Sequence, residues 1–225
     1  MSHILSLLAL LVFALVPGPT IALESEGAKR FWFVFLESGK KTPDDKEAVA
    51  AMQRGHIDNF KRLFAEKKLF AAGPLRDPSR LKRGIVVVHA ANKAEILGYF
   101  QPDAYVRDGY MTASAVPAIV RRGLNAEGID AESVEEVRIV QIYRPAAKAD
   151  GISARAGEAF LQSLLDKGTI GAWYTLEDGP VAEVLFARTT DDRMLEVALS
   201  PHPALAAKSA TMQIWAQWLS KGAVK

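Results

Sequence analysis

The sequence of 225 residues contains no cysteine. This absence excludes disulfide bonds, catalysis by a thiol, and attachment of a lipid to a cysteine behind a cleaved leader. An excess of charge of one sign is also lacking, since 28 Lys and Arg against 26 Asp and Glu give a formal net charge of +2 at pH 7. So small a net charge provides no general attraction to a polyanion or an acidic membrane surface, and we expect no nucleic-acid partner.

Common catalytic and binding motifs are lacking as well. No Gly-x-Ser-x-Gly nucleophile elbow surrounds Ser38 or Ser114, and the stretch 37–41 holds a single glycine, unlike a phosphate-binding loop. The histidines lie far apart in the sequence, with none of the spacings of a metal site: His3, His56, His89 and His202. We therefore expect no metal and no other cofactor.

Only the N-terminus carries a long apolar run. Residues 4–16 are apolar apart from Ser6, and the segment 17–19 that follows is Pro-Gly-Pro. The run is too short to cross a bilayer as a helix, which takes roughly 20 residues, and Thr-Ile-Ala at 20–22 supplies small residues ahead of a cleavage site. We predict a signal peptide over 1–22, a secreted or periplasmic protein, and no stable membrane insertion after its removal. No Lys or Arg precedes the run, which leaves an uncleaved anchor as the alternative.

Behind the leader, the apolar patterns predict two series of elements in the same order, β-α-β-β-α-β. This order is that of the ferredoxin-like arrangement, in which both helices lie on one face of an antiparallel sheet. The first series comprises strand 31–36, helix 43–68 with Gly55 as a candidate break, strands 69–74 and 84–90, helix 92–100 and strand 109–120. The second comprises strand 137–143, helix 153–167, strands 169–175 and 181–187, helix 191–199 and strand 209–218.

We interpret the two series as an internal duplication. A shift of one hundred places aligns Phe60 with Phe160 and Lys67 with Lys167. The strand 31–36 is apolar on both alternating faces, so its sheet should be covered on both sides. The prediction is an α+β fold in which two ferredoxin-like βαββαβ repeats pack sheet to sheet as an intrachain dimeric α/β barrel, without need of a homodimer; we expect a monomer or weak homo-oligomer. The units are a first repeat at 29–120, a linker at 121–136, and a second, degenerate repeat at 137–222.

His56 lies on the helix predicted for the first repeat. Ile57, Phe60 and Phe64 recur there at spacings of three and four, so we expect them to face the sheet, with His56 beside this stripe. Position alone favours a histidine that packs or caps at the edge of a helix and is satisfied by a backbone group. A chemical role would require a partner from elsewhere in the chain.

A set of short motifs changes this interpretation when its members are taken together: His56 near the helix start, AAGPL at 71–75, Gly84 ahead of an apolar strand, and QPDAYVRDGY at 101–110. The set resembles the YCII-related family over about 31–120. The resemblance implies that His56 and Asp103 form a catalytic acid/base dyad, and that Gly73 and Pro74 bend the backbone beside a substrate pocket. The sequence departs from the family in one respect, because the commoner family order has Asp before Pro, whereas Asp103 follows a proline.

The second repeat lacks both members of this pair, with Ala156 and His202 at the corresponding positions. Two hypotheses follow for an exported protein whose partner is a small molecule. In the first, a cofactor-independent lyase, isomerase or hydrolase uses His56 as general acid and base, with Asp103 orienting the ring. In the second, the protein is a non-catalytic ligand-binding or structural protein of the cell envelope. The sequence does not choose between them.

Overall fold

The computed structural model describes residues 28–127, 129–144 and 151–225. The elements of the first half are β1 Arg30–Ser38, α1 Lys46–Ala65, β2 Leu69–Pro74, β3 Lys82–Ala90, α2 Lys93–Tyr99, α3 Ala104–Arg107 and β4 Met111–Arg122. Those of the second half are β5 Asp130–Tyr143, α4 Gly151–Asp166, β6 Ala172–Leu176, β7 Val181–Ala187, α5 Asp192–Leu199, α6 Pro203–Ala206 and β8 Thr211–Lys221.

The strands form one antiparallel sheet in the order β2-β3-β1-β4-β6-β7-β5-β8. The two halves join where β4 pairs with β6, with Val120 opposite Tyr174. The outer strands β2 and β8 approach each other at a bridge between Leu75 and Gln217, so the sheet nearly closes into a barrel. The expected α+β class is confirmed. The halves are joined through strand edges as well as through the facing surfaces that the sequence predicted.

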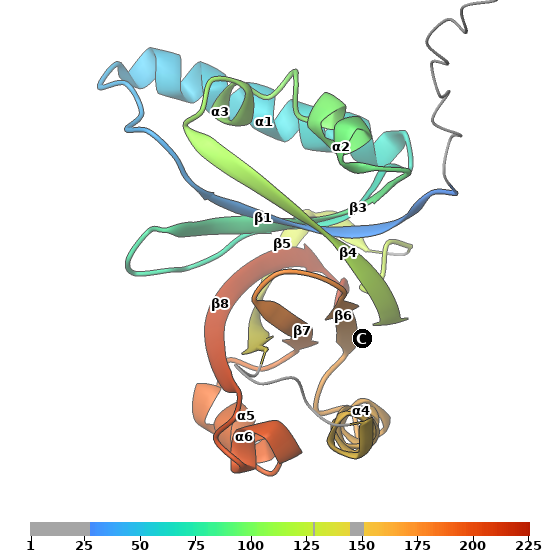
Figure 1. The fold of residues 1–225 in the computed structure, drawn as a ribbon. Coiled ribbons are helices and arrows are strands. Elements are labelled where there is room, and N and C mark those ends of the chain that lie inside the picture. The colour runs from blue at the N-terminus through green and yellow to red at the C-terminus, as the bar shows by residue number, and fades with distance from the viewer. Residues whose placement is uncertain (1–27, 128, 145–150) are drawn as a thin grey trace, which may run out of the picture.

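Helices cover the outside of this barrel, and the two halves face each other across its inside (Figure 1). Trp32 and Val34 of β1 pack outward in a cluster with residues of α1 and α2, whereas Phe33 points inward. Inside the barrel, Phe33 shares a cluster with Ile139 and Phe186 of the second half. Both faces of β1 are therefore buried, as its uninterrupted apolar sequence predicted.

The halves also repeat one another in the order of their pairings. β1 pairs with β3 and β4, and β5 pairs with β7 and β8. A shared order of elements does not demonstrate a shared origin, so the duplication stays a prediction.

Several element boundaries differ from those predicted. The first helix begins later than position 43, because Asp45 caps it by accepting hydrogen bonds from the N–H groups of Glu47 at 2.9 Å and Ala48 at 3.2 Å. It continues through Gly55 without a break. The predicted linker 121–136 is shortened to 123–129, because pairing with β6 and β8 extends β4 and β5 beyond their apolar segments. The short helices α3 and α6 were not predicted.

The predicted signal peptide, 1–22, lies outside the described residues. Within the described part of the chain, no helix combines the length and the apolar character needed to span a membrane.

Candidate functional site

The structure brings His56 and Asp103 together across 47 positions of sequence. Nδ1 of His56 lies 2.6 Å from Oδ2 of Asp103. The histidine comes from α1, and the aspartate is the N-cap residue of α3, where its Oδ1 accepts a hydrogen bond of 3.0 Å from the N–H of Tyr105. One carboxylate oxygen therefore caps a helix and the other holds the imidazole.

This pair is buried. The Asp103 side chain is 0% exposed and that of His56 is 11% exposed. A buried carboxylate is costly unless it is paired and hydrogen-bonded, and Asp103 meets this requirement through its two partners. The imidazole is also held by its neighbours, since its ring centroid lies 4.3 Å from that of Phe60 and 5.7 Å from that of Tyr105, which it meets edge to face. The ring therefore has little freedom to turn.

The hydrogen bond to Asp103 decides where the neutral imidazole carries its proton. An ionised carboxylate can only accept a hydrogen bond, so Nδ1, which faces Asp103, must be the donor and carry the proton. The other ring nitrogen, Nε2, then keeps its lone pair. Nε2 has no hydrogen-bond partner among the described residues, and it is not one of their fully enclosed polar atoms. This nitrogen is the atom of the pair that can take a proton from another molecule.

The face of α1 that carries His56 differs from the expected one. Ile57 is 41% and Phe64 is 37% exposed, so these two members of the predicted stripe do not cover the sheet. Phe60, the third member, packs against the buried cluster of the first half as expected. The buried residues of α1 are His56, Asn59 and Leu63. Polar side chains can be buried on this face because they form hydrogen bonds there. For example, Nδ2 of Asn59 donates to the carbonyl oxygen of Tyr99 at 3.0 Å. The helix is rotated relative to the prediction.

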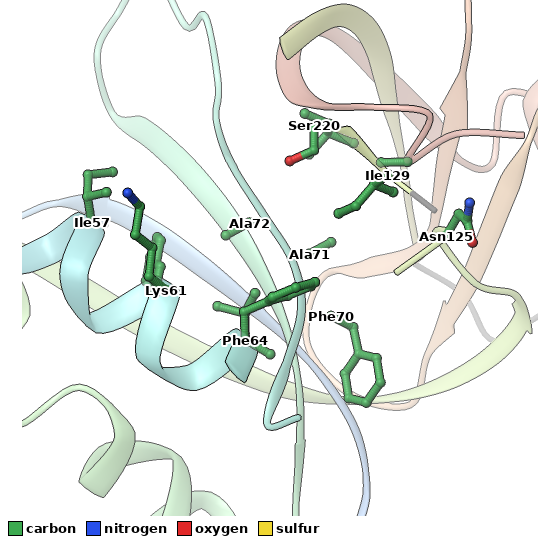
Figure 2. A pocket seen from close by; sticks show the side chains of 13 residues that line it. Ile57, Lys61, Phe64, Phe70, Ala71, Ala72, Asn125, Ile129 and Ser220 are labelled. Carbon is green, nitrogen blue, oxygen red and sulfur yellow. The ribbon is translucent and has the colours of Figure 1, made fainter. Parts of the chain in front are cut away.

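The displaced apolar stripe lines a pocket of about 310 Å³ between the two halves of the molecule. Figure 2 shows Ile57, Lys61 and Phe64 of α1 on one side and Asn125, Ile129 and Ser220 on the other. The remaining lining residues are Phe60, Leu69, Phe70, Ala71, Ala72, Leu219 and Ala223. The sequence patterns did not predict this pocket. The apolar residues spaced by three and four along α1, Ile57, Phe60 and Phe64, are nevertheless the ones that line it.

Phe60 connects the pocket to the dyad. It lines the pocket and contacts the ring of His56, whereas neither His56 nor Asp103 belongs to the lining. A molecule in the pocket would therefore lie one aromatic ring away from the imidazole.

Gly73 and Pro74, predicted beside a substrate pocket, do not line this one. Gly73 lies against β8 instead, where its carbonyl oxygen accepts a hydrogen bond of 3.2 Å from Nε2 of Gln217. A Cβ atom at Gly73 would lie 2.1 Å from the carbonyl oxygen of Trp218. The glycine thus permits β2 to approach β8, which is a structural reason for its presence.

The second half has a packed histidine in place of the dyad. His202 is the N-cap residue of α6, as Asp103 is of α3, but its side chain makes no capping hydrogen bond. Its ring packs against Gly157, where a Cβ atom would lie 2.9 Å from Nε2, and its Nδ1 is buried without a partner among the described residues. Burial lowers the pKa of His202, so a neutral ring fills this place.

Comparison with known proteins adds information on the fold. No protein-family model matches the sequence, and no curated protein matches it by sequence. A proposed monooxygenase from Fusobacterium nucleatum has a TM-score of 0.56 at 8% identity, over 88% of this chain and 95% of that one. A variant of chlorite dismutase from Candidatus Nitrospira defluvii has a TM-score of 0.56 at 13% identity, over 87% and 92%. A heme-binding protein from Thermus thermophilus reaches 0.50 at 10% identity, over 85% and 93%. These likenesses show the fold alone.

Because one of these similar proteins is described as heme-binding, we asked whether the described residues of this chain could hold heme. Heme needs an axial ligand that faces a cavity. No histidine lines the pocket beside α1 or a second cavity at the barrel mouth. His89 lies with its ring centroid 5.0 Å from that of Phe31 and 6.2 Å from that of Phe70, and His202 is buried. Tyrosine is also an axial ligand of heme, and Tyr143 lines the second cavity. Its hydroxyl is hydrogen-bonded to Gln213 at 2.7 Å, and this cavity of about 160 Å³ is too small for heme. The two cavities therefore do not fit heme, and the described residues include no cluster of three acidic or histidine side chains suited to a metal ion.

Proposed function

We propose that the protein is an exported enzyme that works without a cofactor and moves a proton on a small molecule, with His56 as general acid and base and Asp103 orienting its ring. The observation that carries this proposal is the buried 2.6 Å contact between Nδ1 and Oδ2, which leaves the lone pair of Nε2 unpaired among the described residues. The resemblance to the YCII-related family supports it. Export rests on the apolar run at 4–16 alone, and sequencing the N-terminus of the mature protein tests it.

The proton transfer follows from this geometry. Nε2 takes a proton from an acidic C–H or O–H group of the substrate, and the imidazolium that forms is stabilised through its Nδ1–H by the carboxylate of Asp103. Return of the proton to a neighbouring atom gives an isomerase. Its delivery to a leaving group gives a lyase.

The pocket beside α1 is the proposed place of the substrate. Its lining is mainly apolar, with Lys61, Asn125 and Ser220 as polar members. We propose that the substrate lies with its apolar part in this pocket and its reacting end directed toward His56, past the ring of Phe60, which lies 4.3 Å from the imidazole. Access to His56 then requires the side chain of Phe60 to rotate.

Deuterium exchange tests the proposal before the natural substrate is identified. Small lactones and keto acids are incubated with the protein in D₂O, and exchange at carbon is followed by NMR. We expect exchange with at least one compound, and a loss of about 10²–10⁴-fold in His56→Gln, which is the usual contribution of a general base. Circular dichroism should show that the variant is folded. Absence of exchange with the wild type, or full activity in the variant, contradicts the proposal.

The tautomer of His56 provides an independent test. Nitrogen-15 shifts of the ring should show the neutral proton on Nδ1 in the wild type, because Asp103 accepts there. In Asp103→Asn this preference should weaken, since an amide can present either a donor or an acceptor to the ring. A ring protonated on Nε2 in the wild type contradicts the proposed role of the aspartate.

A non-catalytic binding protein is the second candidate. The observation that favours it is the absence of both dyad residues from the pocket lining. A ligand that binds wild type and His56→Gln with equal affinity, and is recovered unchanged from both, would support this second function.

A further inference from the structure

Among the described residues, Lys61 is the one charged member of the lining of the pocket beside α1. The other polar members, Asn125 and Ser220, carry no charge, and the remaining lining residues are apolar. No carboxylate of the described chain belongs to this lining, so the wall holds no group that would attract a cation. The charge on the wall therefore favours an anion.

The ammonium of Lys61 has no partner of its own within the described part of the chain. Asp58 lies three positions before it on α1, a spacing that favours ion pairs on a helix, yet the two form none. Near the end of the same helix, Arg62 and Lys68 both pair with Glu66, at 2.8 Å and 2.7 Å. Lys61 thus differs from these neighbours in that its charge is available to a ligand.

Large apolar side chains are exposed on both sides of Lys61. Ile57 is 41% exposed and lies four positions before it, and Phe64 is 37% exposed and lies three positions after it. Figure 2 shows the three side chains along the side of α1 that borders the pocket. Exposed apolar side chains that gather at a groove are typical of a binding site. This wall therefore suits a molecule that is apolar and carries one negative charge.

The opposite wall adds hydrogen-bonding groups but no charge. The Asn125 amide is engaged at both ends, because its Nδ2 donates to the carbonyl oxygen of Gly222 at 3.3 Å and its Oδ1 accepts from the N–H of Glu127 at 3.3 Å. The hydroxyl of Ser220 is uncharged. Recognition of a charged group in this pocket therefore depends on Lys61.

We propose that the substrate of the proton transfer is a carboxylic acid with an apolar chain, and that Lys61 binds its carboxylate. The inference rests on the proposed function for the reaction, but not for the binding. The pocket has a volume of about 310 Å³, that of about ten water molecules in the liquid, so the substrate is an acid of about the size of octanoate. Lys61 follows Phe60 directly on α1, so the carboxylate lies on the wall that carries the ring next to His56.

An NMR titration of the nitrogen-15-labelled protein tests the binding with octanoate, 1-octanol and octylammonium. We expect octanoate to bind about tenfold more tightly than octylammonium at neutral pH, with octanol between them, because Lys61 attracts one charge and repels the other. Octanoate should also bind about tenfold more tightly than butanoate, since its longer chain covers more of the apolar wall. Shifts of the amide signals of Ala71, Ala72 and Ser220 would place the ligand in this pocket.

The variant Lys61→Glu should reverse the preference, so that octylammonium binds about tenfold more tightly than octanoate. Lys61 is exposed, so the substitution leaves the core unchanged. Its matched control is Lys46→Glu, because Lys46 is also an exposed lysine of α1 but does not line the pocket, and this variant should keep the preference of the wild type. Phe64→Ser should weaken the binding of octanoate and octylammonium alike, because it removes apolar wall but no charge.

The result can be separated from that of the proton transfer. His56 does not line the pocket, so His56→Gln should bind octanoate as the wild type does. Selective binding of octanoate without deuterium exchange in any acid would support this inference and contradict the proton transfer, whereas exchange in neutral compounds alone would do the reverse. The inference is also overturned if octanoate does not bind, if it binds no more tightly than octylammonium, or if Lys61→Glu keeps the preference of the wild type.

Discussion

At the scale of single residues, the two helix-capping positions before α3 and α6 show how a partner decides the role of a histidine. Asp103 before α3 holds the ring of His56 and caps the helix with its second oxygen. His202 before α6 meets Gly157 and the ring of Phe160, whose centroid lies 5.8 Å from its own. Nε2 of the first histidine is not fully enclosed and has no partner among the described residues, whereas the second histidine is packed with its Nδ1 buried.

Protonation of His202 should destabilise the protein at acidic pH. Burial lowers its pKa in the folded state below the value of 6.5 of an unperturbed histidine. The contribution of the neutral ring to the free energy of unfolding is therefore fully present above the pKa that His202 has in the unfolded state. This contribution is lost as the pH falls through the pKa of His202 in the folded state. The free energy of unfolding, measured in urea at pH 7.5 and 5.0, should fall less for His202→Gln than for the wild type. Equal losses would show that other groups cause the acid sensitivity.

At the scale of elements, β2 depends on a single glycine for its position beside β8. A Cβ atom at Gly73 would lie 2.1 Å from a backbone oxygen. A backbone atom cannot move out of the way by rotating a side chain. Gly73→Ala should therefore destabilise the protein by about 1–3 kcal/mol, the usual cost of overpacking. Urea unfolding measures this loss.

Gly55→Ala is the matched control for that substitution. Gly55 lies within α1, and apart from its chain neighbours and the backbone of its own helix turn no described atom lies within 4 Å of the place of its Cβ. Alanine there should stabilise the protein by about 0.5–1 kcal/mol, because it favours the helix over the unfolded chain. Equal effects of the two substitutions would mean that the approach of β2 to β8 is not limited by Gly73.

Local patterns predicted these elements well where local forces dominate. The strand 181–187 agrees with β7 at both ends, and Asn92 caps α2 as expected, accepting a hydrogen bond from the N–H of Glu95 at 2.9 Å. The prediction that Ile57 and Phe64 face the sheet was wrong, whereas Phe60 does pack against the buried cluster. The spacing of apolar residues identifies a face of a helix but not what covers it. Asn59 faces inward because its side-chain amide donates a hydrogen bond to the carbonyl oxygen of Tyr99 in α2. The local sequence of α1 does not reveal this partner.

The candidate site was harder to predict than the fold. Only a family resemblance, and no spacing in the chain, suggested that His56 and Asp103 would meet. The substrate-binding prediction for Gly73 and Pro74 shares this origin, and neither residue lines the pocket.

At the scale of the whole molecule, each half completes the core of the other. Phe33, Ile85 and Val87 of the first half are 0% exposed, and they share the barrel interior with residues such as Val137 and Phe186. Removal of the second half would leave this apolar face uncovered. Large uncovered apolar faces are rare on soluble monomers and lead to association.

The first half alone, 28–122, should therefore self-associate. A second copy can cover the same face, since a twofold dimer joins identical surfaces and both halves have the same order of strands. Light scattering after size-exclusion chromatography should show at least a dimer. Phe33→Asp in this fragment places a charge on the uncovered face and should shift it toward monomer or unfolded chain, whereas Leu97→Asp, at a residue 58% exposed on the outer helices, should leave the dimer intact. A folded, monomeric fragment would contradict the view that the interior of the barrel needs both halves.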